Sequence, residues 1–329
     1  MTDVLLSKAC LFHTDLNSSA VCLGTALMGS TIAEAHAFQM LDSYVEAGGN
    51  FLDSARVYAD WLPGGTSASE RTVGNWIKTR KNRPQIILAT KGGHPPLSEM
   101  GKSRLARKDL EQDIELSLGC LAVDQIDLYW LHRDDPARDV GEIMETMDAL
   151  IQSGKIRYFG CSNWRVNRVA EALAYSSAHG LAGFVAMQNL WSLAHADMKC
   201  FPDDSLQTMD PAAIHLCQEK GLAIIPYSSQ ANGFFTKCAH AGKMHYDSAI
   251  KGPYESALNY ARLRAAVRIA KRMSASVTDV ALAYLISQRA LTIPVIGPRS
   301  NDQLMESLRN PGLRLDRETL CELEAGDIP

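Results

Sequence analysis

Short apolar runs alternate with segments of helical periodicity along nearly the whole chain, and this alternation constrains the fold most strongly. Strands are predicted at residues 19–23, 50–52, 85–90, 125–131, 156–160, 184–188, 222–226 and 292–296. Strands that alternate with helices form parallel sheets with crossover helices. Eight such units favour an α/β fold of the (β/α)8 TIM-barrel type, with eight parallel strands and long loops at the C-terminal face.

The segments between these strands have apolar residues at helical spacing. Helices are predicted at residues 33–47, 67–78, 108–121, 140–153, 166–177, 211–220, 256–273, 278–288, 302–308 and 316–325. Ser67 and Glu70 predict a capping box at the start of the second helix. Residues 1–18 are expected to form an N-terminal lead-in, and residues 233–253 an irregular loop. No composition shift divides the chain, so residues 1–329 are predicted to form a single barrel domain.

Charge and cysteine usage exclude several classes of function. The chain has 33 Lys and Arg against 37 Asp and Glu, a net charge of -4, so neither nucleic acid nor an anionic membrane is an expected partner. No apolar run reaches the ~18 residues that a membrane span requires. The eight cysteines form no C-x-x-C pair, so neither a zinc ribbon nor a thioredoxin-like site is indicated, and no metal site is predicted. Without a recognisable signal peptide, reduced thiols and a cytoplasmic location are expected.

Polar side chains stand at or just past the C-terminal ends of six predicted strands: Asp53, Lys91, His132, Asn163, Gln188 and Tyr227. In a barrel these strand ends meet at one mouth, where active sites are built. Each residue alone could simply cap a strand or satisfy a loop. Six of them on six strands predict a shared site.

The chemistry of four residues is mutually consistent. A lysine in a pocket must be paired, and Asp53 can pair Lys91. A cationic Lys91 near Tyr58 is expected to lower the pKa of the phenol from ~10 and make it a general acid. His132 could donate to a substrate oxygen or relay a proton, although a lone histidine can equally be a satisfied core residue.

Several segments, in order, resemble the aldo-keto reductase superfamily over nearly the whole chain: residues 50–55 with Tyr58, 89–91, 126–132, 154–157, 160–163 and 293–297. The resemblance implies an NADP(H)-dependent oxidoreductase that reduces an aldehyde, ketone or sugar-like carbonyl to an alcohol. Asp53, Tyr58, Lys91 and His132 match the family's catalytic tetrad. Nicotinamide would give a hydride to the carbonyl carbon while Tyr58 protonates the oxygen.

The resemblance also implies a cofactor site. It assigns the nicotinamide carboxamide to Ser162, Asn163 and Gln188, and stacking on the nicotinamide face to Tyr227. Gly24 and Thr25 resemble the family's cofactor contact at the first strand. The resemblance assigns the pyrophosphate and the adenosine phosphate to Ser228, Gln230, Gly233, Gly297, Arg299, Gln303 and Ser307. An arginine at the last strand favours NADP(H) over NAD(H), although Arg299 could be a solvated surface residue. Pro298 and Ser307 depart from the family's usual residues at their positions.

Aromatic and charged residues near the predicted mouth indicate the substrate class: Trp61, Arg133, Asp134, Trp164 and Trp191. Indole faces stack on the CH side of a sugar while polar groups bind its hydroxyls, which suits a hydroxylated or sugar-like carbonyl. The alternative is that Arg133 and Asp134 form ion pairs and the tryptophans belong to the core.

Two other functions compete with an active reductase. A cofactor-binding regulatory subunit of the same fold would show little or no turnover, but the four filled catalytic positions favour the enzyme. A barrel hydrolase would need a second carboxylate near Asp53. Lys91 would hold Asp53 ionised, so this function is disfavoured.

Overall fold

Eight parallel strands form the central sheet of the computed structural model, which describes residues 6–247 and 249–327. They are β3 (Cys22–Gly24), β4 (Phe51–Asp53), β5 (Ile87–Gly92), β6 (Ile126–Leu131), β7 (Ile156–Ser162), β8 (Ala186–Gln188), β9 (Ala223–Ile224) and β10 (Val295–Ile296). Hydrogen bonds join them in the order β10-β3-β4-β5-β6-β7-β8-β9. Sequence order is kept around the sheet because each crossover leads to the neighbouring strand.

Backbone hydrogen bonds between the two ends of this sheet close the barrel. Ile224 in β9 donates to the carbonyl of Leu291 at 2.8 Å, and Ile293 donates back to Ile224 at 2.8 Å. Val295 in β10 donates to the Pro226 carbonyl at 3.0 Å. The (β/α)8 fold predicted from the alternation is therefore confirmed.

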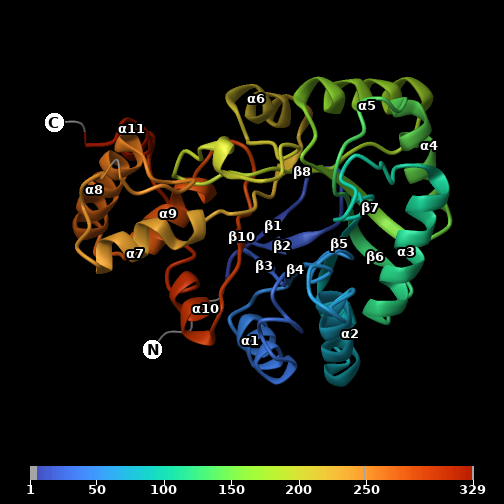
Figure 1. Cartoon of the computed structure of the whole chain (residues 1–329), viewed down its shortest axis with the longest axis horizontal. Coiled ribbons are helices and arrows are strands. Elements are labelled where there is room, and N and C mark those ends of the chain that lie inside the picture. The colour runs from blue at the N-terminus through green and yellow to red at the C-terminus, as the bar shows by residue number, and fades with distance from the viewer. Residues whose placement is uncertain (1–5, 248, 328–329) are drawn as a thin grey trace.

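Eleven α-helices are found in the described part of the chain. They are α1 (Glu34–Glu46), α2 (Ala68–Arg80), α3 (Arg107–Leu121), α4 (Val140–Gln152), α5 (Val166–His179), α6 (Pro211–Lys220), α7 (Phe234–His240), α8 (Ala257–Arg272), α9 (Val277–Ile286), α10 (Asn301–Ser307) and α11 (Arg317–Ala325). Helices α1 to α6 surround the strands, and α7, α8, α9 and α11 gather on one side (Figure 1). Within residues 6–247 and 249–327, none of these helices is long and apolar enough to span a membrane.

Two local predictions are wrong. Residues 233–253 are not irregular throughout, because α7 forms there with Phe234 and Phe235 buried. Ser67 makes no capping bond, since its backbone is left-handed, with φ at 53°. Its supposed partner Glu70 is buried and accepts a hydrogen bond from Thr90 at 2.6 Å.

Both faces of the barrel strands are buried, which explains why they read as continuous apolar runs. In β6, Leu128 and Trp130 pack inside the barrel, whereas Tyr129 and Leu131 pack against the surrounding helices. This alternation follows from the two-residue period of a strand. Polar residues are therefore most informative in the sequence where an apolar strand ends.

A two-stranded hairpin closes the end of the barrel where the strands begin. It consists of β1 (Lys8–Cys10), within the predicted lead-in, and β2 (Asn17–Ser19), which ends one residue past it. Leu11 and Leu16 in its turn pack with Phe51 inside the barrel. The hairpin therefore closes the core at the end opposite the strand C-termini.

Leu11→Ala should lower the free energy of unfolding by about 2–5 kcal/mol, because it opens a cavity under a fully buried side chain. The neighbouring Phe12 is 53% exposed, so Phe12→Ala should change stability by less than about 0.5 kcal/mol. Urea unfolding of both variants measures the difference. Equal losses would contradict the role assigned to the hairpin.

Candidate active site

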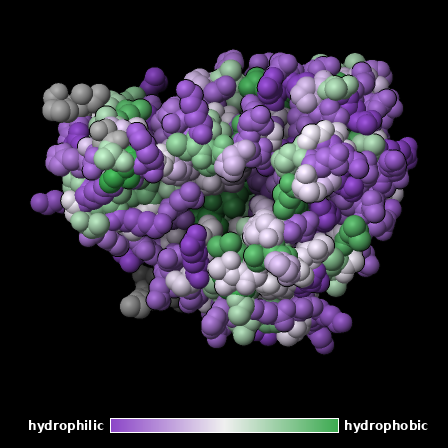
Figure 2. Space-filling view, viewed as in Figure 1, coloured by the Kyte–Doolittle hydropathy of each residue, from purple (hydrophilic) through white to green (hydrophobic). Residues whose placement is uncertain are grey.

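The predicted polar residues meet at the C-terminal ends of the barrel strands. Asp53, Ser162 and Gln188 are the last residues of β4, β7 and β8. Strands β3 to β8 run counter-clockwise in Figure 1, the order that right-handed crossovers give when a barrel is viewed from these ends. Figure 2 shows a hollow at the centre of this face, with hydrophobic residues at its floor.

Lys91 is at the centre of the site, in β5, and is 1% exposed. Its ammonium group forms an ion pair with the carboxylate of Asp53 and donates to the Ser54 carbonyl at 2.8 Å. It also donates to the Tyr58 hydroxyl at 3.0 Å. Gln188 donates to the other Asp53 carboxylate oxygen at 3.2 Å. Each of the three ammonium protons thus has an acceptor, which a buried lysine requires.

The charge of Lys91 fixes the direction of its hydrogen bond with Tyr58. An ammonium group can only donate, so the Tyr58 oxygen accepts and its own proton is free for another partner. Burial raises the pKa of Tyr58 above its ordinary value, although Lys91 opposes this. The expected net lowering of this pKa is therefore not found, because desolvation outweighs the charge of Lys91. Tyr58 is protonated at neutral pH and can act as an acid.

His132 follows β6, with its ring centre 6.1 Å from that of Tyr58. Burial, and secondly the charge of Arg133, lower the pKa of His132 well below its usual range, so the ring is neutral. Its buried Nδ1 has no hydrogen-bond partner in the described residues. With its proton on Nε2, the neutral ring can donate a hydrogen bond.

Ser162, Asn163 and Tyr227 form a connected group beside the tetrad. The Asn163 side-chain oxygen accepts from the Tyr227 hydroxyl at 2.8 Å and from the Gln207 backbone at 3.1 Å. Its amide nitrogen donates to the Ser162 hydroxyl at 3.1 Å. Asn163 has a left-handed backbone, with φ at 60°, which asparagine tolerates better than most residues.

Four of the predicted adenosine-phosphate and pyrophosphate residues gather around α10. Gln230 donates to the Ser307 hydroxyl at 3.0 Å, and the Arg299 backbone donates to the Gln303 side chain at 2.9 Å. The Arg299 side chain is exposed and makes no ion pair with any residue that the structure describes. An unpaired cation there remains available to an anion.

The remaining predicted cofactor residues have mainly backbone roles. Thr25 is buried, and its hydroxyl donates to the Asp53 carbonyl at 3.1 Å. A Cβ at Gly24 would lie 2.9 Å from Val295, so glycine permits the close strand packing there. Ser228 and Gly233 have positive φ angles of 53° and 77° and shape the turn before α7. Gly297 borders open space.

The predicted substrate residues differ in how exposed they are and in which groups they contact. Trp61 is 53% exposed, and Trp191 is almost buried, with its ring centre 6.1 Å from that of Tyr284. Arg133 donates to the His132 carbonyl at 2.8 Å and pairs with Asp203 at 2.7 Å. Arg133 thus borders the site, but its charge is already paired.

Trp164 and Asp134 do not join this site. Trp164 is fully buried and packs against Phe184, with ring centres 5.1 Å apart. Asp134 pairs with Arg168 of α5 at 3.2 Å. Core packing and an ion pair, the alternatives stated above, account for these two residues, so neither is retained as a substrate contact.

The chain was also compared with known proteins by sequence. The model of the Aldo/keto reductase family matches residues 20–327. The chain belongs to the aldo/keto reductase family. Norsolorinic acid reductase stcV of Emericella nidulans is 30% identical over 323 residues, which cover 93% of this chain and 77% of that protein. Aryl-alcohol dehydrogenase GME11368 of Pestalotiopsis microspora is 28% identical, covering 94% of this chain and 78% of that protein.

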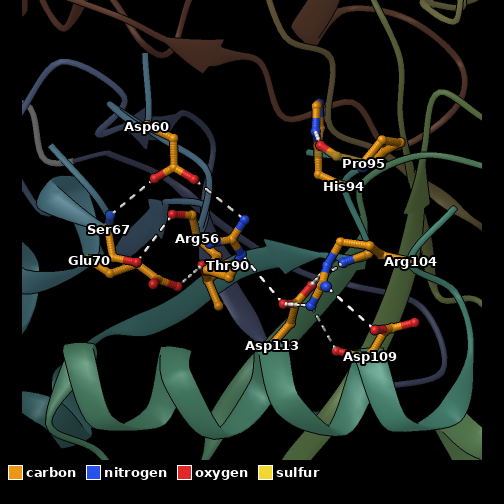
Figure 3. A network of polar contacts seen from close by, with 11 residues as sticks. Arg56, Asp60, Ser67, Glu70, Thr90, His94, Pro95, Arg104, Asp109 and Asp113 are labelled. Carbon is orange, nitrogen blue, oxygen red and sulfur yellow. Dashed lines mark hydrogen bonds and ion pairs between the residues drawn. The ribbon is translucent and has the colours of Figure 1, made fainter. Parts of the chain in front are cut away.

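In this aldo/keto reductase family member, a polar network behind β5 supports the site (Figure 3). Arg56, two residues before Tyr58, lies 3.4 Å from the carboxylates of both Asp60 and Asp113. Asp113 in α3 also accepts from the Gly93 backbone at 2.9 Å. The network joins the Tyr58 loop to the turn after Lys91. This network was not predicted from the sequence. Asp113, a carboxylate among the apolar positions of α3, was the feature that could have indicated it.

His94 is the other residue that the sequence analysis missed. It lies three residues past Lys91, and its ring centre is 4.8 Å from that of His132. The only available signal was its position just after a strand end and a Gly-Gly turn.

Two cavities lie away from the mouth. One, of about 580 Å³, is at the end of the barrel where the strands begin and is lined by Asn17, Asn50 and Ile87 among others. Its two arginines, Arg83 and Arg157, both pair with Asp127. The other, of about 660 Å³, is a groove lined by residues of α2 and α3, among others. Neither is lined by a residue of the tetrad.

Proposed function

We propose that this protein reduces the carbonyl group of an aldehyde, ketone or sugar-like substrate to an alcohol, with NADPH as the reductant. The observation that carries the proposal is the hydrogen bond from Lys91 to Tyr58 at 3.0 Å, with Lys91 itself paired to Asp53. This arrangement leaves the Tyr58 proton free to be donated. Relatives named as reductases and dehydrogenases support the same chemistry.

The residues present fit a nicotinamide cofactor. Ser162, Asn163 and Gln188 offer hydroxyl and amide groups, which suit a carboxamide. Arg299, exposed and without an ion pair in the part of the chain that is described, suits the 2′-phosphate that distinguishes NADPH from NADH. When bound, this cofactor supplies a hydride to the carbonyl carbon.

The side chains of the tetrad then have distinct tasks. Tyr58 gives its proton to the carbonyl oxygen as negative charge develops there. His132 donates from Nε2 to the same oxygen and orients it. Lys91 stabilises the phenolate that Tyr58 becomes, and Asp53 keeps Lys91 charged and in position.

Tyr58→Phe should lower kcat for NADPH-dependent aldehyde reduction by about 10²–10⁴-fold, because it removes the proton donor. The dissociation constant for NADPH, measured by fluorescence titration, should change little. Tyr175→Phe on the outer side of α5 is the matched control and should keep wild-type turnover. Near-normal turnover by Tyr58→Phe would refute its role as the acid. Cofactor-bound wild-type protein that reduces no aldehyde, ketone or sugar would favour the regulatory subunit.

Arg299→Ala should weaken NADPH binding by about tenfold or more and leave NADH binding nearly unchanged, because only NADPH carries the 2′-phosphate. Parallel titrations with the two cofactors measure this difference. Arg289, an exposed arginine before β10, provides the control substitution Arg289→Ala. Equal losses for both cofactors would refute the phosphate role.

The kcat of reduction should stay constant from about pH 6 to about pH 9. Burial raises the pKa of Tyr58 above its ordinary value of ~10, so the acid form persists until that pKa is passed and activity then falls. His132 is neutral over the same range because its pKa is lowered well below 6.5. An inflection between pH 6 and 8 in the kcat profile would contradict both assignments.

A further inference from the structure

His94 lies beside His132 at the mouth and has no task in the reaction described above. It is 5% exposed, and the two rings meet edge to face, with centres 4.8 Å apart and planes at 66°. A polar ring buried this close to the reacting groups either packs against them or binds part of the substrate.

The contacts of His94 fix which of its nitrogens carries the proton. Nδ1 lies 2.6 Å from the Pro95 carbonyl oxygen. A carbonyl can only accept, so Nδ1 carries the hydrogen, and in the neutral ring Nε2 is a bare acceptor. Burial, and secondly Arg133, lower the pKa of His94 to about 4, which keeps the ring neutral. No donor to Nε2 is found among residues 6–247 and 249–327.

The backbone around His94 is held firmly (Figure 3). The preceding Gly93 donates to Asp113 at 2.9 Å and has a φ of 69°, which favours glycine. A Cβ at Gly93 would lie 2.6 Å from a Leu105 methyl group, so the turn is also tightly packed. Arg104 pairs with the same Asp113 at 2.5 Å. His94 is therefore a preorganised acceptor.

The two histidines are complementary. His132 offers a hydrogen to an oxygen, whereas His94 offers a lone pair to a hydrogen. A carbonyl satisfies only the first of them. A hydroxyl on a nearby carbon of the same molecule satisfies the second, and ring centres 4.8 Å apart suit two such neighbouring groups. A substrate without the hydroxyl would leave Nε2 buried and unpaired, which is unfavourable.

We propose that His94 is a specificity-determining residue that accepts a hydrogen bond from a substrate hydroxyl one or two carbons from the carbonyl. The protein would therefore prefer hydroxylated carbonyl compounds over substrates of equal size that lack the hydroxyl. This inference rests on the proposed function, because it concerns the substrate of the same site.

Two pairs of ketones of nearly equal size test the inference: hydroxyacetone with butanone, and 4-hydroxybutan-2-one with pentan-2-one. The ratio of kcat/KM within each pair, with NADPH, is the readout. In His94→Phe this ratio should fall by about tenfold or more, because the ring is kept and the acceptor is lost. His94→Gln restores an acceptor and should recover part of the preference.

His179→Phe is the matched control. This histidine also has Nδ1 beside a backbone carbonyl, that of Tyr175 at 2.9 Å, but it is exposed on α5. The ratio of kcat/KM within each ketone pair should be the same in His179→Phe as in the wild type. An unchanged ratio in His94→Phe, or equal turnover of both ketones by the wild type, would overturn the inference and leave the proposed function standing. A wild type that reduces no carbonyl compound would overturn both.

Nitrogen-15 spectra of the histidine rings in the wild-type protein keep the test independent of how the variants fold. The His94 signals should show a protonated Nδ1 and a bare Nε2, and Nε2 should shift when hydroxyacetone is added to the complex with the oxidised cofactor, NADP⁺, in which the ketone cannot be reduced. A proton on Nε2, or no shift with the hydroxylated ketone, would overturn the inference.

Discussion

The buried ion pair between Lys91 and Asp53 is the interaction on which the site depends. A lysine that is 1% exposed stays charged only if its burial is offset, and Asp53 does so: burial lowers the pKa of Lys91, but the carboxylate holds it above its usual value. The charge of Lys91 in turn orients the Tyr58 phenol. Asp53 is itself held by Gln188, so three strands, β4, β5 and β8, contribute to the position of the Tyr58 phenol.

The barrel makes this convergence possible. Its short strands are mostly apolar, and all of them end at the same face, where the polar residues of the site meet. The hairpin at the other end packs Leu11 and Leu16 against the barrel interior. Behind the strands, Asp113 ties the Tyr58 loop to the turn before His94 through Arg56 and Gly93. The position of the proposed acid, Tyr58, and the position of the proposed acceptor, His94, are thus linked by one carboxylate.

Much of the fold was predictable because alternating apolar runs and helices leave few arrangements. The convergence of Asp53, Lys91 and His132 was predictable too, since the C-terminal ends of the strands in a parallel barrel meet at one face. Trp164 and Asp134 were predicted as substrate contacts, whereas in the structure Trp164 packs on Phe184 and Asp134 pairs with Arg168. Adjacency to a strand end does not say which way a side chain points. Residues 233–253 were misassigned because Phe234 and Phe235 are buried by neighbours distant in sequence, which stabilise a short helix that local composition does not reveal.

The sequence by itself determined the barrel and the identity of the four catalytic candidates, because both depend on the local order of apolar and polar residues along the chain. Only the tertiary structure decided that burial outweighs Lys91 in setting the pKa of Tyr58, since desolvation depends on every group packed around the phenol. Likewise, it alone decided that His94 meets His132, because their contact joins the loops after β5 and β6, 38 residues apart.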